Sequence, residues 1–282
     1  MICAWQQFVD LLPVWMRESV DKHGRNTLLE LRLRLGLPAE LVCLNKNIQL
    51  ERSVTTCDLQ FCINTASKYS PWTATTASDG YITAPGGHRI GICGKTVNAN
   101  GKTTGIREAT SLCLRVSRDF PGIASNASTC TGSILIIGCP GAGKTTLLRD
   151  LIRQRANNGC GSIAVVDERE EIFPYFQGKS IFDHGLRTDI LSGCNKAHGI
   201  IAVIRSMGPS TIALDEITAE EDCKALLHAG WCGISLIATA HASSKSDLLS
   251  RPIYRPIVDS GLFETLIVMN GDKSWTKERL NV

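Results

Sequence analysis

The hydrophobic pattern of the chain changes character near residue 120. Before that point, apolar residues alternate with polar ones over short runs, and between residues 28 and 35 leucines at every second position are separated by Glu30, Arg32 and Arg34. Alternation of this kind is typical of a strand with one buried face. Further strands are predicted at residues 41–44, 81–83, 88–97 and 111–117, with a hairpin turn at Asn100-Gly101.

Two stretches of this N-terminal part have helical spacing. Residues 3–21 carry several aromatic and aliphatic side chains, and Pro13 either breaks this helix or opens a second one. Such a segment is a packed amphipathic helix, which we favour, or a surface that docks on a membrane or a partner. Residues 58–70 predict another helix. Residues 1–120 are therefore expected to form a smaller α+β domain with an antiparallel sheet.

From residue 133 onward, largely apolar runs alternate with helical segments. The runs predict buried strands at residues 134–137, 163–166, 211–214, 236–239 and 266–269. This alternation indicates an α/β domain with a mostly parallel sheet. Residues 121–132 are rich in Pro, Gly, Ser, Asn and Thr, which is typical of a linker.

The segment GCPGAGKT at residues 138–145 lies between the first of these strands and a helix. It fits G-x-x-x-x-G-K-[ST], the phosphate-binding (P-loop) motif. Its glycines let backbone N–H groups turn towards phosphate oxygens, Lys144 reaches the β- and γ-phosphates, and Thr145 offers its hydroxyl to Mg²⁺. ATP and Mg²⁺ are therefore the expected cofactors. The predicted nucleotide-binding residues are Gly138, Cys139, Pro140, Gly141, Ala142, Gly143, Lys144, Thr145 and Thr146.

Acidic residues follow a later strand of the same domain. Asp215 and Glu216 come directly after residues 211–214, and the carboxyl ends of parallel strands form the edge at which such sheets bind ligands. Asp215 is expected to hold Mg²⁺ and Glu216 to orient the attacking water. His241 follows another strand and is expected to sense the phosphate or the water-positioning carboxylate. An inserted strand between the P-loop strand and the Asp-Glu strand favours a RecA-like or AAA-like motor, and no guanine-reading N-K-x-D motif occurs.

Composition narrows the range of partners and compartments. The 282 residues carry a net charge of +3 without a long run of Lys or Arg, which counts against a nucleic-acid-binding protein. The twelve cysteines are scattered without a C-x-x-C pair, so we expect buried thiols in a reducing cytosol rather than disulfides or a zinc site. The N-terminus does not resemble a signal peptide, and no segment reaches the roughly 18 apolar residues of a membrane span.

The motifs, in this order, resemble the stage III sporulation protein AA family of endospore-forming bacteria. The stretches that carry the resemblance are GCPGAGKTTLLRD, VVDEREEI, GLRTDILSGCNKAHG, IRSMGPSTIALDEIT and HAGWCGISLIATAHAS, with LELRLRLGLPAEL and YITAPGGHRIGICGKTV upstream. That family is similar to the hexameric secretion ATPases of type II and type IV systems. The resemblance covers nearly the whole chain and implies a RecA-like/AAA P-loop ATPase domain over residues 133–282.

The resemblance also implies roles for single residues. Asp167 and Glu168 fall in what secretion ATPases call the aspartate box, the Asp-Glu pair forms the Walker B motif, and His241 lies in the histidine box. Arg205 aligns with an arginine just upstream of Walker B. Secretion ATPases usually carry Gly-Glu in Walker B, so this chain departs from them there. The predicted catalytic residues are Glu216, Glu168, His241 and Arg205, and the predicted metal ligands are Thr145 and Asp215.

We therefore expect a Mg²⁺-dependent ATPase that works as a hexameric ring. The family is expected to drive assembly or transport by a channel between mother cell and forespore, with the chain peripheral on the cytoplasmic, mother-cell side of a complex of membrane proteins. An arginine from a neighbouring subunit, either Arg187, Arg205 or Arg89, would complete the site. Two alternatives remain: a RecA-like ATPase that acts on nucleic acid through a basic, aromatic groove, and a nucleotide-dependent binding switch with negligible turnover.

Overall fold

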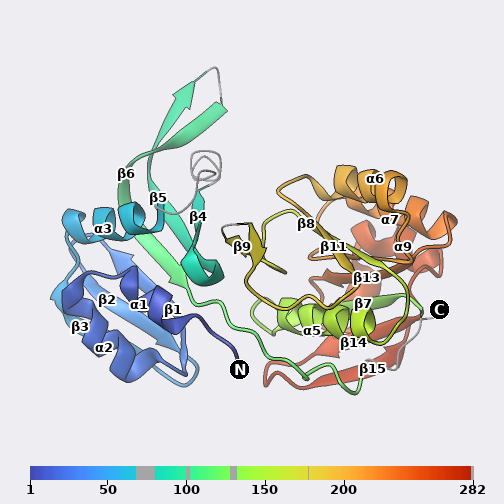
Figure 1. Cartoon of the computed structure of the whole chain (residues 1–282), viewed down its shortest axis with the longest axis horizontal. Coiled ribbons are helices and arrows are strands. Elements are labelled where there is room, and N and C mark those ends of the chain that lie inside the picture. The colour runs from blue at the N-terminus through green and yellow to red at the C-terminus, as the bar shows by residue number, and fades with distance from the viewer. Residues whose placement is uncertain (68–79, 100–101, 128–131, 177, 281–282) are drawn as a thin grey trace. The chain divides into compact units, whose positions relative to one another are not determined.

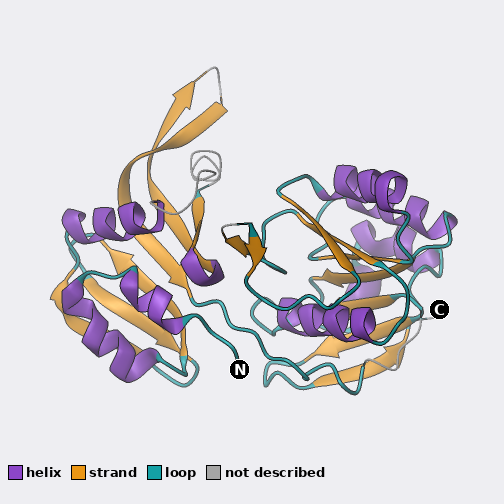
Figure 2. Cartoon of the chain, viewed as in Figure 1, coloured by secondary structure: helices purple, strands orange, loops and turns teal. Residues whose placement is uncertain are grey.

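A computed structural model describes residues 1–67, 80–99, 102–127, 132–176 and 178–280 of the protein (Figures 1 and 2). The chain divides into two compact units, one of Met1–Asp119 with Pro174–Ile181 and the other of Phe120–Phe173 with Phe182–Val282. The division at residue 119 lies next to the expected end of the N-terminal domain. Residues 174–181 also belong to the first unit. The hydrophobic pattern does not predict this, because this short segment lies inside the expected ATPase domain.

The first unit is built on a six-stranded antiparallel sheet with strand order β3-β2-β1-β6-β5-β4. Its strands are β1 (Leu28–Arg34), β2 (Pro38–Cys43), β3 (Asn47–Ser53), β4 (Tyr81–Ala84), β5 (His88–Ala99) and β6 (Lys102–Arg115). Its helices are α1 (Trp5–Asp10), α2 (Val14–Gly24), α3 (Thr56–Ser67) and the short 3-10 turn η2 (Pro85–Gly87). The two-residue strands β9 (Tyr175–Phe176) and β10 (Lys179–Ser180) pair with each other, and β9 lies against η2.

Strand β1 shows why the alternating pattern predicts this sheet. Leu31 and Leu33 are fully buried in the core of the first unit. On the other face, Glu30 bonds to Arg32 at 2.7 Å and to Arg115 of β6 at 3.2 Å. The predicted strand is confirmed. Strand β3 was not predicted, because it buries none of its side chains fully and so leaves little hydrophobic signal.

The predicted N-terminal helix is two helices, with Pro13 at the N-cap of α2. Phe8 of α1 and Met16 and Val20 of α2 are fully buried in the core. The favoured interpretation, a packed amphipathic helix, is therefore confirmed for this face. The predicted turn at Asn100-Gly101 and the end of the helix predicted to residue 70 lie outside the described residues.

The second unit contains a seven-stranded sheet with strand order β11-β8-β12-β13-β7-β14-β15. Its strands are β7 (Ile134–Ile137), β8 (Ile163–Asp167), β11 (Thr188–Ser192), β12 (Thr211–Leu214), β13 (Ser235–Ala240), β14 (Thr265–Met269) and β15 (Trp275–Arg279). Its helices are α5 (Lys144–Asn157), α6 (Lys196–Met207), α7 (Glu220–Trp231), α8 (Lys245–Ser250), the 3-10 turn η3 (Pro252–Tyr254) and α9 (Arg255–Asp259). All pairings are parallel except that of β14 with β15.

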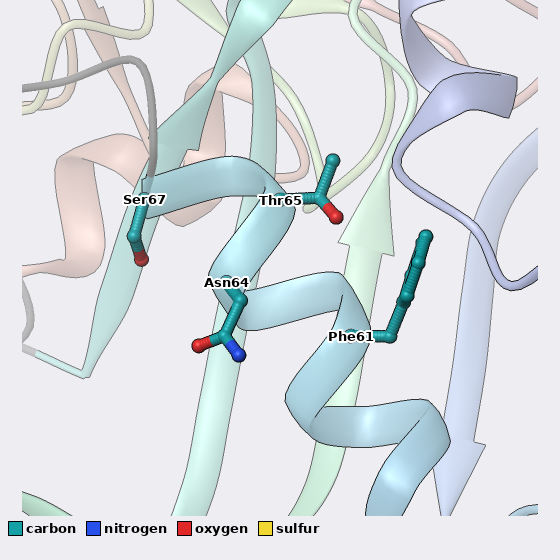
Figure 3. A pocket seen from close by; sticks show the side chains of 4 residues that line it. All are labelled: Phe61, Asn64, Thr65 and Ser67. Carbon is teal, nitrogen blue, oxygen red and sulfur yellow. The ribbon is translucent and has the colours of Figure 1, made fainter.

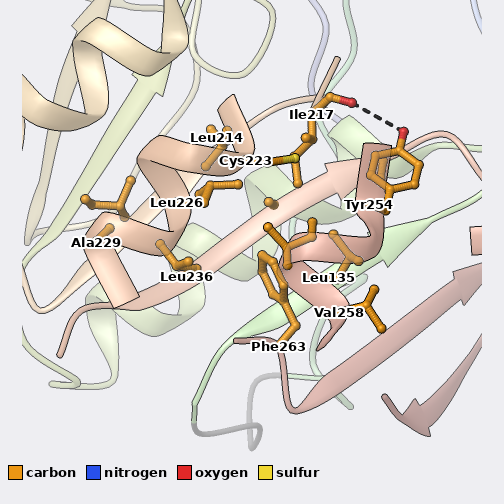
Figure 4. Close-up of a cluster of buried hydrophobic side chains, with 14 of the residues drawn as sticks. Leu135, Leu214, Ile217, Cys223, Leu226, Ala229, Leu236, Tyr254, Val258 and Phe263 are labelled. Carbon is orange, nitrogen blue, oxygen red and sulfur yellow. Dashed lines mark hydrogen bonds between the residues drawn. The ribbon is translucent and has the colours of Figure 1, made fainter. Parts of the chain in front are cut away.

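Helices cover this sheet on both faces. A buried cluster joins alternate strand residues, such as Leu135 and Leu236, to Leu226 of α7 and Val258 of α9 (Figure 4). Helix α5 contributes nothing to that cluster, and its apolar side packs against the opposite face of the sheet (Figure 1). Alternation of strand and helix thus produces an α/β unit with a mostly parallel sheet, as predicted, and its helices lie on both faces of that sheet.

One feature of the strand order concerns the site. Strand β13 lies between β7 and β12, so the predicted insertion of a strand between the P-loop strand and the Asp-Glu strand is confirmed.

Strands β11 and β15, the outermost strands of this sheet, were not predicted. Both are less buried than the central strands, and neither carries a fully apolar run.

Cysteine burial differs from expectation. The described cysteines are free thiols, as expected, and Cys43, Cys62 and Cys223 are buried. Others are exposed, however. Cys139 and Cys232 lie in loops, whereas Cys57 of α3 and Cys93 of β5 lie on solvent-facing positions of their elements. Among the described residues, none of the helices combines the length and hydrophobicity needed to cross a membrane.

Candidate active site

The P-loop motif lies between the end of β7 and the start of α5. Strand β7 is fully buried, so it fixes the first residue of the loop. Gly143, the N-cap of α5, has φ +101°, a conformation that other residues rarely adopt. At Gly138, a Cβ atom would come within 2.8 Å of the Cβ of Met269 on β14. Both glycines are therefore required by the backbone, one for its dihedral angles and one for close packing.

Lys144 is turned back over the loop. Its Nζ donates to the carbonyl oxygens of Gly138 at 2.8 Å and Cys139 at 3.2 Å, and lies 3.0 Å from Nδ1 of His241. The residue is 7% exposed. Burial lowers the pKa of Lys144, while the carboxylates of Glu216 and Asp215 oppose that change. The ammonium is thus held where the loop carbonyls and two nearby carboxylates compensate its charge.

Asp215 is the centre of a hydrogen-bond network at the end of β12. The hydroxyl of Thr145 donates to Oδ2 of Asp215 at 2.9 Å, and the hydroxyl of Thr239 donates to Oδ1 at 2.7 Å. The backbone N–H of Glu216 donates to Thr239 Oγ1 and to Asp215 Oδ1, both at 3.0 Å. Thr239 was not predicted as a site residue. The signal for it is a hydroxyl within the run of β13 that is otherwise apolar from Leu236 to Ala240, two positions before His241.

His241 connects the lysine to the glutamate. Its Nε2 lies 2.8 Å from Oε1 of Glu216, and its Nδ1 faces Lys144. Because the ammonium of Lys144 can only donate, Nδ1 accepts and Nε2 carries the proton that it donates to Glu216. Lys144, His241 and Glu216 therefore form a continuous chain of hydrogen bonds across the ends of three strands.

Asp167 at the end of β8 is a buried anchor for the loop that follows it. Its carboxylate accepts from the backbone N–H groups of Glu171 at 2.9 Å, Ile172 at 2.9 Å and Phe173 at 2.8 Å. Burial raises the pKa of Asp167 to about 7; Asp215 adds to the rise, and the N–H donors oppose it. Arg149 of α5 donates to the Glu171 carbonyl at 2.9 Å, so the same loop is tied to the P-loop helix.

Glu168, the residue after Asp167 at the end of β8, contacts helix α6 instead of the 171–173 loop. It bonds to the ammonium of Lys196, the first residue of α6. Glu168 and Lys196 line a small cavity of about 20 Å³ together with Asp215 and Glu216. The structure thus brings the predicted Glu168 to the Walker B carboxylates, and it adds Lys196, which sequence analysis missed.

The remaining predicted residues are distributed as follows. Cys139 and Pro140 are exposed at the turn of the P-loop, and Thr146 is half-buried. Arg205 is exposed in the last turn of α6, which lies near the amino ends of the parallel strands. The P-loop follows the carboxyl end of its strand, so Arg205 does not reach the P-loop of its own chain. Sequence analysis also missed Lys273, which follows β14 and donates to the carbonyl of Gly141.

A second pocket lies on the first unit. The described residues that line it are Phe61, Asn64, Thr65 and Ser67 of α3 (Figure 3). None of these four side chains is charged or metal-ligating in the way that Asp215, Thr145 and Lys144 are. The candidate active site therefore lies at the carboxyl ends of the parallel strands of the seven-stranded sheet.

Comparison with known proteins agrees with the motifs. The family described as sporulation stage III, protein AA, matches residues 5–279. The chain belongs to this family. It is 34% identical over 280 residues to stage III sporulation protein AA of Bacillus subtilis (strain 168), a match over 95% of this chain and 91% of the relative. It is also 29% identical over 262 residues to an uncharacterized protein, ycf45, of Cyanidium caldarium, over 88% of this chain and 71% of the relative.

Solved structures show the same fold at much lower identity. The Legionella pneumophila ATPase DotB matches with a TM-score of 0.60 and 18% identity, over 95% of this chain and 80% of DotB. The pilus retraction motor PilT with bound ADP matches with a TM-score of 0.58 and 13% identity, over 89% of this chain and 76% of PilT. The family and the fold class, a RecA-like ATPase domain with a smaller N-terminal domain, are thus as predicted.

Proposed function

We propose that the chain is a Mg²⁺-dependent ATPase that works as a ring motor. The observation that carries this proposal is the network in which Thr145, Asp215 and Thr239 hold one another at the end of β12, beside the Lys144–His241–Glu216 chain. Phosphoryl transfer to water needs three kinds of group. This site offers a hydroxyl next to a carboxylate, a lysine over a glycine loop and a half-exposed glutamate.

The residues at this edge fit Mg²⁺ and a nucleoside triphosphate. Thr145 and Asp215 present hard oxygen atoms 2.9 Å apart, the donor type that Mg²⁺ prefers, and they would hold it. When bound, the ion neutralises charge on the β- and γ-phosphates. The positive φ of Gly141 and Gly143 turns backbone N–H groups of the loop towards an anion.

The chain's own residues would divide the work of hydrolysis. Lys144 stabilises the charge that develops on the phosphate oxygens. Glu216 orients the attacking water and accepts its proton, and it is half-exposed, so water reaches it. His241 holds Glu216 through Nε2, and Thr239 fixes both Asp215 and the backbone of Glu216. Asp167 keeps the 171–173 loop in place at the end of the neighbouring strand β8.

The motor role rests on family and fold. The chain belongs to a sporulation family and shares the fold of DotB, an ATPase, and of PilT, a pilus retraction motor that binds ADP. We propose that it forms a hexameric ring, peripheral to a membrane complex on the mother-cell side, and that its partners are the membrane proteins of a channel between mother cell and forespore. Residues 1–120, with the linker at 121–132, would act as the domain that couples the ATPase domain of residues 133–282 to those partners.

A steady-state ATPase assay over a dilution series, with the particle size measured at each concentration, tests this proposal. Turnover per subunit should rise as rings form and should rise again with the cytoplasmic segment of a membrane partner. Equal activity in demonstrably monomeric protein would contradict the ring. Stimulation by DNA would favour the RecA-like alternative, and binding without turnover under all conditions would favour the switch.

A further inference from the structure

The ion pair between the buried Lys196 and the partly exposed Glu168 has no part in the mechanism above. Lys196 is the first residue of α6, and its Nζ donates to Oε2 of Glu168 at the end of β8. The side chain of Lys196 is 9% exposed and that of Glu168 is 30% exposed. The pair therefore joins a helix start to a strand end at the ligand-binding edge of the sheet.

The position of Lys196 is unfavourable for a lysine. The first turn of a helix carries a partial positive charge, which raises the energy of a cation there, and α6 has no acidic residue in its first turn. Taking an ammonium out of water adds a further cost, and a pair of this kind is a weak source of stability. Stability therefore does not explain why the residue is a lysine.

The space that the pair faces offers a different explanation. The pair lines a cavity of about 20 Å³, which is room for one water molecule, and Asp215 and Glu216 line the same cavity. Asp167 and Glu171 line it as well, so most of the titratable groups around it are carboxyl groups. Among the residues that line it, Lys196 is the buried cation, whereas Arg169 is exposed. Without Lys196, repulsion by the other carboxylates would favour a rotamer of Glu168 turned out to solvent.

We propose that Lys196 is a positioning residue for ATP hydrolysis and that it acts through Glu168. It holds the Glu168 carboxylate at the cavity wall, with one oxygen bonded to the ammonium and the other left to accept a hydrogen bond from a water shared with Glu216. Two carboxylates then fix this water, and Lys196 balances their charge. The inference rests on the proposed ATPase function and assigns to that site a residue on α6 for which the sequence indicated no role.

The first experiment compares Lys196→Met and Lys196→Arg in the full chain, with Lys224→Met on the exposed side of α7 as the matched control. Three quantities are measured: kcat and KM for ATP, retention of ADP–aluminium fluoride, and the thermal unfolding midpoint without nucleotide. Lys196→Met should lower kcat and the retention of ADP–aluminium fluoride about 10–100-fold, with little change in KM. The unfolding midpoint should not fall, Lys196→Arg should recover most of kcat, and Lys224→Met should resemble wild type.

A double-variant cycle shows whether Lys196 acts through Glu168. Glu168→Gln alone should lower kcat, and adding Lys196→Met to it should cause little further loss, because the residue that Lys196 positions is already disabled. Fully additive losses would overturn the proposal. So would a kcat of Lys196→Met within about twofold of wild type, or equal losses in Lys196→Met and Lys196→Arg with a lowered unfolding midpoint.

The same assay separates failure of this inference from failure of the proposed function. If wild type hydrolyses ATP, Glu216→Gln does not, and Lys196→Met behaves as wild type, only the role of Lys196 is contradicted. If wild type shows no turnover in any assembled form, the ATPase proposal is contradicted and the role of Lys196 falls with it.

Discussion

Thr145 and Asp215 are 70 residues apart in the sequence, and the hydroxyl of the first donates to the carboxylate of the second at 2.9 Å. The contact is possible because β12 and β7 run parallel on either side of β13, so the residues that follow both strands meet at one edge. This bond joins the P-loop motif to the Walker B motif. It places the two predicted metal ligands side by side.

Lys144→Ala should abolish nucleotide binding or turnover. The variant removes the ammonium that reaches the β- and γ-phosphates, and a loss of at least about 100-fold in kcat/KM is expected. The measurement is ATP affinity by a fluorescent analogue together with steady-state hydrolysis, with Lys224→Ala as the control. Wild-type affinity and rate in Lys144→Ala would remove the P-loop from the account.

Thr239→Val should weaken the Walker B site while preserving its shape. Asp215 loses the donor at 2.7 Å and the N–H of Glu216 loses one of its two acceptors. We expect about a tenfold loss in the affinity for Mg²⁺ in the presence of ATP and a stability loss of about 1–2 kcal/mol. Thr239→Ser keeps the hydroxyl and should stay close to wild type. A Mg²⁺ titration of turnover that is the same for Val and Ser would show that Thr239 has no such role.

Asp167 should make the stability of the protein depend on pH. Its pKa is raised to about 7 in the folded chain, so between about pH 4 and pH 7 the folded state binds more protons than the unfolded state, and this contribution to stability is lost as the pH rises through that window. Asp167→Asn does not titrate. Its amide also places an NH₂ group against backbone N–H donors, so the variant is less stable at low pH.

The measurement is the free energy of unfolding by urea at pH 4.5 and pH 8 for wild type and Asp167→Asn. The deficit of the variant should shrink towards high pH, by no more than about 4 kcal/mol. A deficit that is equal at the two pH values would contradict the raised pKa.

A complementation assay can identify the arginine supplied in trans. Subunits that lack it should be inactive alone, since such an arginine contributes about 10³–10⁵ in rate. Mixing them with Lys144→Ala subunits should restore some activity, because mixed rings place an intact P-loop beside an intact arginine. Arg205, Arg187 and Arg89 are tested in turn. No recovery for any of the three would mean that the group lies elsewhere or that each subunit works alone.

The three candidate arginines lie in two different parts of the chain's fold. Arg89 stacks over Tyr81, with its guanidinium carbon 4.0 Å from the ring centroid. In the register of β5 with β6, Arg89 lies opposite Arg115. Arg187 and Arg205 are exposed at the edge of the seven-stranded sheet where its parallel strands begin, opposite the P-loop. For all three, the role in trans stays a prediction.

The central strands and the P-loop could be predicted because their sequence signals are local. Residues 134–137 and 211–214 are buried on both faces, which requires apolar runs, and Gly143 needs a positive φ. Edge strands such as β11 carry a weaker pattern because only part of each is buried. Thr239 and Lys196 could not be assigned from the sequence, since a threonine in a strand and a lysine at a helix start gain their meaning only from Asp215 and Glu168, which lie far away along the chain.

Single-turnover hydrolysis of bound ATP by Glu216→Gln is the decisive test of whether Glu216 activates water in an ATPase site. The amide keeps an oxygen that can accept from His241 but lacks the charge that activates water, so ATP affinity should stay near that of wild type while single-turnover hydrolysis falls about 10²–10⁴-fold. The assay mixes excess protein with labelled ATP and Mg²⁺ and follows the bound nucleotide, with Glu221→Gln on the exposed start of α7 as the control. Uncleaved ATP should be retained on the variant; conversion of bound ATP to ADP at the wild-type rate would contradict the role of Glu216 in hydrolysis.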